Sequence, residues 1–181
     1  MLQPGPPAGV WLVPPDESED RRPQRVPFTA PVGAGPLSAL KVSRDGARIA
    51  LVFGGQLHVG RVEPTGPLPG SAPGWRIADI ALASRELVGV TDVAWQSGTS
   101  LVVLGAFEPE DQLFPAEVAI DGSSLDVVQR PLVGAVAVEI AAAPRRPLVV
   151  GADVEGERQL FRDDGTLFRR VGPGRAPTYP G

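Results

Sequence analysis

The sequence lacks cysteine altogether and contains a single histidine, His58, and a single lysine, Lys41. Without cysteine the protein can form no disulfide, no thiolate metal site and no thiol nucleophile. One histidine excludes metal sites that need two imidazoles, and it restricts a Ser-His-Asp arrangement to one built on His58. No apolar run approaches the roughly 18 residues of a membrane-spanning helix, and no signal segment is visible. We therefore expect this chain itself to be soluble.

A large excess of positive charge is also missing, since the 181 residues carry a formal net charge of −4. Domains that bind nucleic acid normally present a basic field, so we expect no nucleic-acid partner. Glycine and proline, in contrast, are abundant, at 22 and 21 residues. Both are unfavourable inside helices and strands, so the elements between them must be short. With 43% apolar residues the chain can still build a core, and an all-β fold with many turns satisfies both conditions.

From Leu37 onwards the sequence repeats a pattern of short apolar segments separated by turns. Each copy has a strand that runs into a tight turn, then an apolar strand, then a segment that opens on Gln-Leu and a ring. The second and third copies are 47 residues apart at all three landmarks, which are Trp95 and Ala142, Leu101 and Leu148, and Gln112 and Gln159. The first copy precedes the second by 52 residues at two landmarks and by 56 at the third, because of an inserted loop at 108–111.

A fourth extended segment closes each copy, at residues 75–80, 126–130 and 166–170. Four antiparallel strands repeated about every 50 residues are typical of β-propeller blades. We therefore predict an all-β, β-propeller-like repeat of four-stranded antiparallel blades, with blades at about residues 37–86, 87–134 and 135–181. A short helix at Asp79–Leu87, where Ala, Leu, Arg and Glu cluster, is the alternative for that segment.

Residues 1–36 are predicted to be an irregular Pro/Gly-rich lead-in that could be the remnant of a preceding blade. Val10–Val13 is the segment there that indicates a strand, and a charge run occupies Asp16–Arg22. Because propellers normally close with four to eight blades, about three blades plus a partial one predict an incomplete propeller. Either residues 1–36 supply part of a fourth blade or sequence upstream completes the ring, and we favour the second.

His58 is the first candidate for acid–base or metal chemistry. It stands where the other two copies carry Phe114 and Phe161, so we interpret it as a packing residue. Ser43 and Asp45 lie in the turn of the same copy, but Ser-Arg-Asp-Gly is typical of a turn whose polar side chains bond the local backbone.

Acidic residues gather in two places. The denser group could supply oxygen ligands to calcium, but its spacing does not match an EF-hand loop and arginines stand among the acids, so we predict a solvated hairpin. Its members are Asp153, Glu155, Glu157, Asp163 and Asp164. The inserted loop, with Glu108, Glu110 and Asp111, is interpreted in the same way. A carboxylate pair for glycoside hydrolysis is not excluded by sequence, although no pair stands out.

The glycine motifs and the tryptophans complete the search. Gly54-Gly55 precedes no helix and is predicted to be a hairpin turn, and Gly172–Gly174 a terminal turn. Trp11, Trp75 and Trp95 lie in short apolar segments and are interpreted as packing residues. We thus predict no catalytic residue, no cofactor-binding residue, no metal ligand and no enzymatic activity.

Three segments carry a resemblance to a known family. Residues Leu40–Val52, Leu87–Trp95 followed by Leu101–Leu104, and Pro177–Gly181 resemble, in this order, parts of the actinobacterial lipoprotein LpqB family. The resemblance implies a cell-envelope lipoprotein with an anchor, a middle GerMN-type domain and a C-terminal β-propeller-like domain. It also implies a non-enzymatic role with the sensor histidine kinase MtrB and the response regulator MtrA, at the extracytoplasmic face of the cell membrane. The lipidated cysteine and the GerMN domain are not in this sequence, so anchoring is expected to lie outside this chain.

Three functions therefore remain open. The first is a non-catalytic module that contacts an extracytoplasmic protein, a sensor histidine kinase. The second is a propeller hydrolase, which needs a polar pocket with at least two acidic groups at the central channel. The third is an envelope-glycan-binding module, which needs exposed tryptophans.

Overall fold

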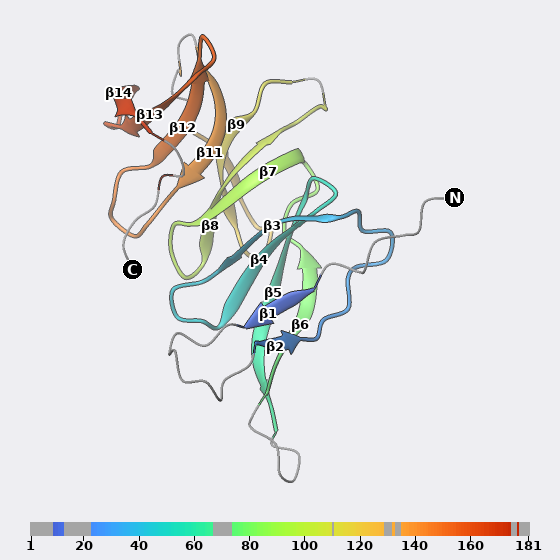
Figure 1. Ribbon diagram of the computed structural model, residues 1–181. Coiled ribbons are helices and arrows are strands. Elements are labelled where there is room, and N and C mark those ends of the chain that lie inside the picture. Colours follow the sequence, from blue (N-terminus) through green and yellow to red (C-terminus); the bar gives the residue numbers. More distant parts are fainter. Residues whose placement is uncertain are drawn as a thin grey trace.

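The computed structural model describes residues 9–12, 23–66, 74–109, 111–128, 132, 135–174 and 177 (Figure 1). These residues form strands and turns and contain no helix, which confirms the predicted all-β class. Within them, accordingly, no helix has the length and apolar character needed to cross a membrane. The charge run at 16–22 and most of the C-terminal segment that carries the resemblance lie outside the described residues.

Three four-stranded antiparallel sheets follow one another along the chain, each with its strands in sequence order. The first contains β3 (Leu37–Val42), β4 (Arg48–Phe53), β5 (Gln56–Thr65) and β6 (Gly74–Leu82). The second contains β7 (Val88–Trp95), β8 (Ser100–Ala106), β9 (Phe114–Ala119) and β10 (Leu125–Val127). The third contains β11 (Val136–Ala141), β12 (Val149–Val154), β13 (Glu157–Asp163) and β14 (Phe168–Pro173). A two-stranded ribbon of β1 (Val10–Leu12) and β2 (Gln24–Val26) precedes them.

The first strand of each sheet lies innermost, as in a propeller blade. β7 contacts both β3 and β11, so the three first strands run side by side. Hydrogen bonds join neighbouring sheets: the Val90 N–H donates to the Gly55 carbonyl at 2.9 Å, and the Ile140 N–H donates to Asp92 Oδ2 at 2.9 Å. The sheets form an open arc, so the predicted incomplete β-propeller-like fold is confirmed (Figure 1).

Two strands are buried on both faces, which explains their unbroken apolar sequences. Ala50 and Val52 of β4 face the second sheet and pack with Leu101 and Val103 of β8. The alternate residues of β8 face the third sheet and belong to a second cluster with Val150 and Phe161. The alternate residues of β4 face the opposite way, away from the second sheet; they are Ile49, Leu51 and Phe53.

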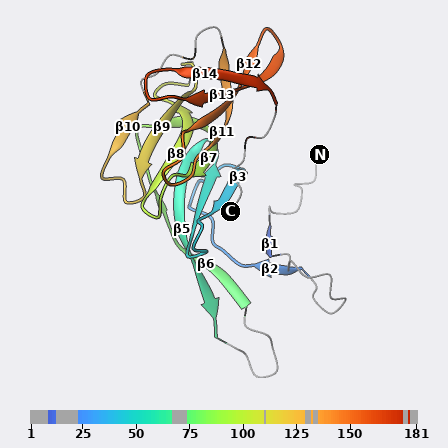
Figure 2. The same ribbon diagram turned by 90° about the vertical axis from the view of Figure 1, so that its left-hand side faces the viewer.

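The ribbon covers part of that outer face of the first sheet. Val26 of β2 is buried against Ile49 and Ile77, and the Ile77 N–H donates to the Pro27 carbonyl at 3.0 Å. Figure 2 shows the ribbon beside the first sheet, on the side away from the second and third sheets. The ribbon is much shorter than the strands it covers, and this mismatch leaves apolar surface open.

The outer face of the third sheet has the opposite chemistry. The strand register places Asp153 opposite Arg158, and Glu139 opposite Gly151, on this face. Arg158 Nη1 lies 2.9 Å from Glu139 Oε1, and its Nε lies 2.9 Å from Asp153 Oδ1. These ion pairs raise the pKa of Arg158, chiefly through its hydrogen bond to Asp153. The described arc therefore has one apolar and one charged outer face.

Three sequence-based interpretations need correction. The helix alternative at Asp79–Leu87 is wrong, because β6 continues to Leu82 with its backbone paired to β5. The terminal turn at Gly172–Gly174 is also wrong for Gly172 and Pro173, which lie in β14 opposite Leu160 and Gln159. The third correction concerns register.

In the second copy, the ring of the Gln-Leu-ring motif, Phe114, lies two residues away from the position that corresponds to His58 and Phe161. His58 lies opposite Leu51, and Phe161 lies opposite Val150, at equivalent places in their sheets. In the second sheet Ala116 takes that place, opposite Val103, whereas Phe114 lies opposite Gly105. The inserted loop shifts the Gln-Leu-ring motif without moving the strand pairing.

Candidate functional site

A hollow of about 320 Å³ lies where the ribbon leaves the outer face of the first sheet uncovered. We call it the ribbon hollow. Every residue that lines it is apolar or glycine; among them are Trp11, Leu12, Val42, Val62, Trp75 and Ile77. Trp75 and Ile77 project from the same face of β6, and Val62 lies opposite Ile77 on β5. The hollow therefore offers contact to apolar groups and no hydrogen-bonding side chain except the indole N–H groups.

The two tryptophans of the ribbon hollow are exposed to solvent. Trp11 is 57% exposed and Trp75 is 41% exposed, so their interpretation as packing residues is wrong. Val42, beside them, is 51% exposed. Sequence position alone could not distinguish these residues from core, because their exposure depends on how much of the sheet the ribbon covers. An apolar surface of this kind is characteristic of interaction sites.

The turn after β3 borders the ribbon hollow through Gly46, and the sequence predicts its conformation. The Ser43 hydroxyl donates to Asp45 Oδ1 at 2.6 Å and accepts the Arg48 N–H at 2.9 Å. The Ala47 N–H donates to the same Asp45 oxygen at 3.0 Å. The Ser43 hydroxyl and this backbone bond hold the pKa of Asp45 below its usual value. The side chains of Ser43 and Asp45 thus stabilise the turn, as their pattern predicts.

A second hollow of about 300 Å³, here called the turn hollow, lies on the other side of that turn. Ser43, Arg44 and Asp45 line it together with Trp95 and Gly98 of the second sheet and Pro144 of the third. The half-buried Trp95 donates its indole N–H to the Lys41 carbonyl at 3.0 Å, and Arg48 Nη1 donates to the Gly98 carbonyl at 2.5 Å. Equivalent turns of three successive sheets therefore meet at one place.

Exposed cations lie beside both hollows. Arg25 lies directly opposite Trp11 in the ribbon, and Arg44 lines the turn hollow. Both are exposed, and no described residue forms an ion pair with either.

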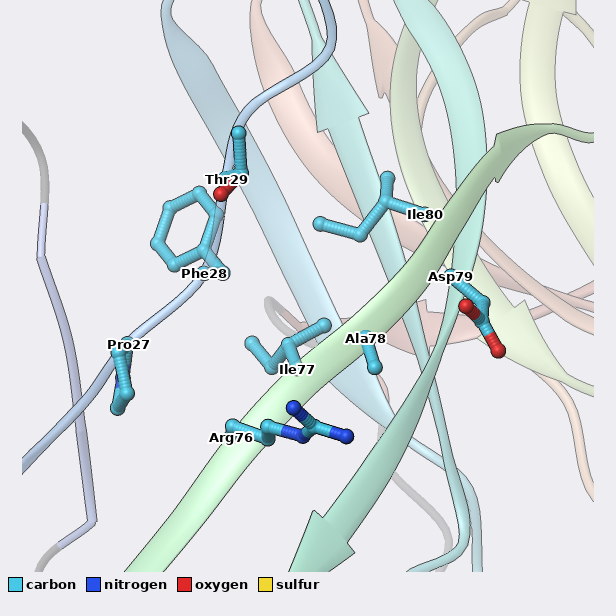
Figure 3. A pocket seen from close by; sticks show the side chains of 8 residues that line it. All are labelled: Pro27, Phe28, Thr29, Arg76, Ile77, Ala78, Asp79 and Ile80. Carbon is cyan, nitrogen blue, oxygen red and sulfur yellow. The ribbon is translucent and has the colours of Figure 1, made fainter. Parts of the chain in front are cut away.

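A further hollow, of about 420 Å³, borders the segment that follows the ribbon. Figure 3 shows Ile77 and Ile80 directed from β6 toward the segment that carries Phe28, and Asp79 directed away from it. The ring of Phe28 packs against that of Phe53, with the centroids 6.1 Å apart and the planes tilted by 40°. These contacts fix the ribbon to the sheet, so we assign this hollow a structural role.

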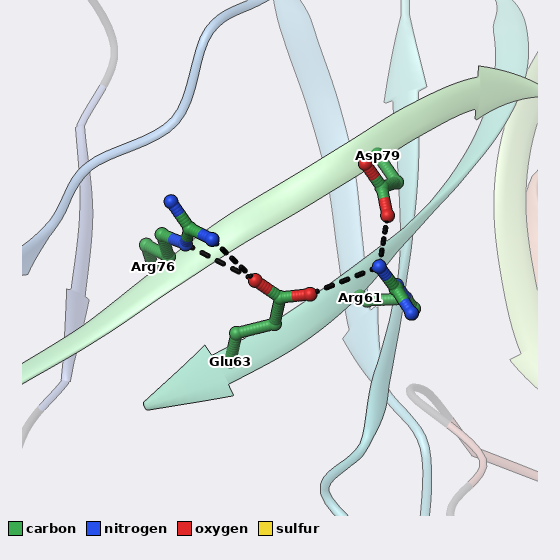
Figure 4. A network of polar contacts seen from close by, with 4 residues as sticks. All are labelled: Arg61, Glu63, Arg76 and Asp79. Atoms are coloured by element: carbon green, nitrogen blue, oxygen red, sulfur yellow. Dashed lines mark hydrogen bonds and ion pairs between the residues drawn. The ribbon is translucent and has the colours of Figure 1, made fainter. Parts of the chain in front are cut away.

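The charged residues near this 420 Å³ hollow form ion pairs with one another. Figure 4 shows Glu63 between Arg76 and Arg61, with Asp79 on the far side of Arg61. Arg76 Nη2 lies 2.8 Å from Glu63 Oε2, Arg61 Nη2 lies 3.1 Å from Glu63 Oε1, and Arg61 also bonds Asp79. Exposed pairs of this kind contribute little stability, and they leave no free charge for a ligand.

A polar hollow of about 510 Å³ lies between the second and third sheets. Glu117 and Asp126, directly opposite each other on β9 and β10, line it together with Gln96, Arg146 and Asp163. Among the described side chains, Gln96 Oε1 is buried without a hydrogen-bond partner. The hollow holds more than two acidic groups, as the hydrolase alternative requires. It extends to the outer strand β10, however, and not along the inner strands.

His58 occupies a packed position. Its side chain is buried at 5% exposure, its ring meets Phe53 edge-on at 5.6 Å, and Nδ1 lies 3.2 Å from the Gln56 carbonyl oxygen. Gly54 and Gly55, whose φ angles are 54° and 78°, form the adjacent hairpin turn as predicted. No acidic side chain within the described residues contacts the imidazole.

Two acidic residues of the third sheet pair with arginines, and a third, Asp163, accepts the Gly165 N–H at 2.8 Å. Asp153 bonds Arg158, and Asp164 bonds Arg169. Of the inserted loop, Asp111 accepts the Glu108 N–H at 3.3 Å, and Glu110 lies outside the described residues. No three His, Asp or Glu side chains of the described part of the chain are placed to share a metal ion.

Comparison with known proteins connects this structure to a family. The family model described as the lipoprotein LpqB β-propeller domain matches residues 6–180. A protein of Thermobifida fusca named lipoprotein LpqB is 34% identical over 180 residues, which cover 95% of this chain and 26% of that protein. Proteins of the same name from Streptomyces coelicolor and Mycobacterium tuberculosis are 31% and 29% identical, over 81% and 88% of this chain and 24% and 27% of theirs. The chain thus spans about a quarter of the length of these curated relatives.

Proposed function

Since the chain belongs to the family of lipoprotein LpqB β-propeller domains, we propose that it is a non-catalytic interaction module of a cell-envelope lipoprotein. Its partner in this proposal is the extracytoplasmic sensor domain of an MtrB-like histidine kinase, whose signalling through the MtrA regulator it modulates. The whole protein is held at the extracytoplasmic face of the membrane by a lipid attached outside this chain.

The observation that carries the proposal is the exposed apolar surface at the ribbon hollow. Trp11 and Trp75 expose large indole rings, which elsewhere anchor protein interfaces. Soluble proteins rarely leave such groups together on the surface without a partner. The neighbouring Arg25 and Arg44 supply charge that can orient an approaching protein.

The test is direct binding between the full-length protein and the purified sensor domain of its cognate kinase. We expect a saturable complex, and we expect weaker binding at high salt because the charged rim contributes to the encounter. Absence of binding by the full-length protein over the accessible concentration range would reject the proposal. The sensor domain of an unrelated kinase from the same organism serves as the control.

A glycan-binding module is the second candidate, because the exposure of Trp11 and Trp75 is what that function needs. The lining of the ribbon hollow weighs against it, since only the two indole N–H groups could hydrogen-bond the sugar hydroxyls that would be buried there. Retention of the chain on immobilised chitin or peptidoglycan, lost in Trp75→Ala, would favour this candidate over the protein partner.

A hydrolase is the third candidate, and the hollow with Glu117 and Asp126 is the feature that favours it. Glycosidases act through two carboxyl groups, and these two lie on paired strands. The candidate requires release of reducing ends from envelope polysaccharide by the full-length protein and its loss in Glu117→Gln. An equal rate in wild type and Glu117→Gln would reject it.

A further inference from the structure

The turn after β3 borders two hollows, the ribbon hollow on the outer face of the first sheet and the turn hollow beside the second sheet. All three tryptophans of the chain border these hollows: Trp11 and Trp75 in the ribbon hollow, and Trp95 in the turn hollow. The turn between the hollows contributes Gly46 to the first and Arg44 to the second. A ligand that crosses this turn therefore meets aromatic surface on both sides of it.

The lining of the ribbon hollow selects an apolar group. Leu12, Val42, Val62 and the two indole rings offer contact area, and no acidic or basic side chain lines the hollow. A polar group buried there would lose its hydrogen bonds to water without replacement. A volume of about 320 Å³ has room for a large aliphatic or aromatic side chain.

The rim of the hollows selects negative charge. Arg44 stands in the turn between the hollows, and Arg25 lies opposite Trp11 in the ribbon, outside the lining of the ribbon hollow. Asp45 adds a carboxylate, but its oxygen is already held by the Ser43 hydroxyl and the Ala47 N–H. The exposed guanidinium groups can therefore form charge-assisted, bidentate pairs with carboxylates of a ligand.

We propose that this surface, comprising the ribbon hollow, the Ser43–Gly46 turn and the turn hollow, binds a segment of the protein partner in which a large apolar side chain stands beside carboxylates. The apolar side chain fills the ribbon hollow between Trp11 and Trp75, and the carboxylates pair with Arg25 and Arg44. The inference rests on the proposed function and adds to it the place and chemistry of the contact. A second copy of this chain is a poorer occupant, because a symmetric contact would bring the same arginines together.

The experiment measures binding of the sensor domain to the full-length protein and to its variants. Trp11→Ala and Trp75→Ala should each weaken binding at least about tenfold, as expected for aromatic anchors of an interface. Arg25→Glu and Arg44→Glu should each weaken it about fivefold or more and reduce its dependence on salt. Urea unfolding of each variant checks that the fold is retained, which the exposure of all four side chains leads us to expect.

Matched controls lie on other sheets. Phe107→Ala removes an aromatic ring that is 42% exposed, close to the exposure of Trp75, and Arg162→Glu reverses an exposed charge of the third sheet. Both should bind as wild type does. If wild type binds and the two tryptophan variants bind equally well, the inference is wrong while the proposed function stands. Failure of wild type itself to bind would overturn both.

Two further measurements separate the other occupants. Chitohexaose is titrated into the full-length protein, and sedimentation velocity reports its self-association. No effect of Trp11→Ala or Trp75→Ala on either measurement supports a protein segment as the occupant. Loss of chitohexaose binding or of a dimer in these variants, with binding of the sensor domain unchanged, would assign the surface to a glycan or to a second copy and overturn the inference.

Discussion

Asp164 shows how single side chains hold the turns of this protein. One carboxylate oxygen accepts bonds from the backbone N–H groups of Thr166 and Leu167 and from the Thr166 hydroxyl, and the other accepts a bond from Arg169 Nε. These bonds, led by the one from Arg169, hold the pKa of Asp164 well below its usual 3.8. A carboxyl group with a lowered pKa stabilises the fold above its unfolded pKa and loses that contribution as the pH falls toward the folded value.

We therefore expect Asp164→Asn to lower the urea midpoint at about pH 6 and to have a smaller effect near pH 3. Over that interval the unfolded chain takes up a proton at Asp164, whereas the folded chain does not, so the advantage of wild type shrinks. Urea unfolding followed by circular dichroism measures both midpoints. A difference between wild type and variant that is constant over this pH range would contradict the expectation.

The packing role of His58 can be tested with the residue at the equivalent place in the third sheet. Phe161 is buried at that place, so His58→Phe should change the free energy of unfolding by less than about 1.5 kcal/mol. His58→Ala leaves a cavity beside Phe53 and should cost about 2–4 kcal/mol. Urea unfolding of both variants decides the point, and a large cost of His58→Phe would mean that the imidazole nitrogens carry a specific role.

At the scale of strands and sheets, close approach of backbones determines how neighbouring sheets meet. Gly55 has a φ of 78°, and a Cβ atom there would lie 3.2 Å from the Gly89 Cα atom of the second sheet. Gly33 has nearly the same φ, 76°, but a Cβ atom there would meet nothing within 4 Å. Replacing Gly33 by alanine therefore tests only the cost of the positive φ, whereas replacing Gly55 also tests the cost of the contact between the sheets.

We expect Gly33→Ala to cost about 1 kcal/mol in the free energy of unfolding, because only the positive φ is unfavourable. Gly55→Ala should cost about 2–4 kcal/mol, because the sheets must also separate and the bond from Val90 to the Gly55 carbonyl is strained. Thermal or urea unfolding measures both. An equal loss of free energy of unfolding in the two variants would show that the sheets can move apart at Gly55 without loss of stability.

Sequence patterns predicted the strands because the pattern of apolar residues in a strand reflects which of its faces are buried. The unbroken apolar runs of β4 and β8 and the Ser43–Gly46 turn follow from local chemistry, and the 47-residue spacing gave the repeat. The exposure of Trp75 did not follow, since a residue at an alternating apolar position can face either a covered or an uncovered sheet surface. The two-residue displacement of Phe114 could not be predicted, because the inserted loop at 108–111 preserves the motif and changes the residue that it lies opposite. The ribbon hollow was not predicted because the sequence does not show which face of the first sheet is left uncovered.

At the scale of the whole molecule, the second sheet is the most enclosed, with a packed core on each face. All residues from Leu101 to Ala106 are buried, whereas the ribbon strand β1 has mostly exposed side chains. Because local opening is rarest where burial on both sides must be lost, we expect the slowest amide exchange in β8. The fastest exchange among the strands is expected in β1 and β2. Hydrogen exchange followed by mass spectrometry tests this order, and slower exchange in β12 than in β8 would contradict it.

The difference between the two outer faces of the arc has a consequence for assembly. Stacking the first sheet of one molecule on the third sheet of another would repeat the same step without end and produce a filament. That step would press the apolar face with Trp75 against the ion pairs of Arg158, which would lose water without gaining partners. The mismatch therefore disfavours stacking of the first sheet of one copy of this chain on the third sheet of another, which is the step that would build such a filament.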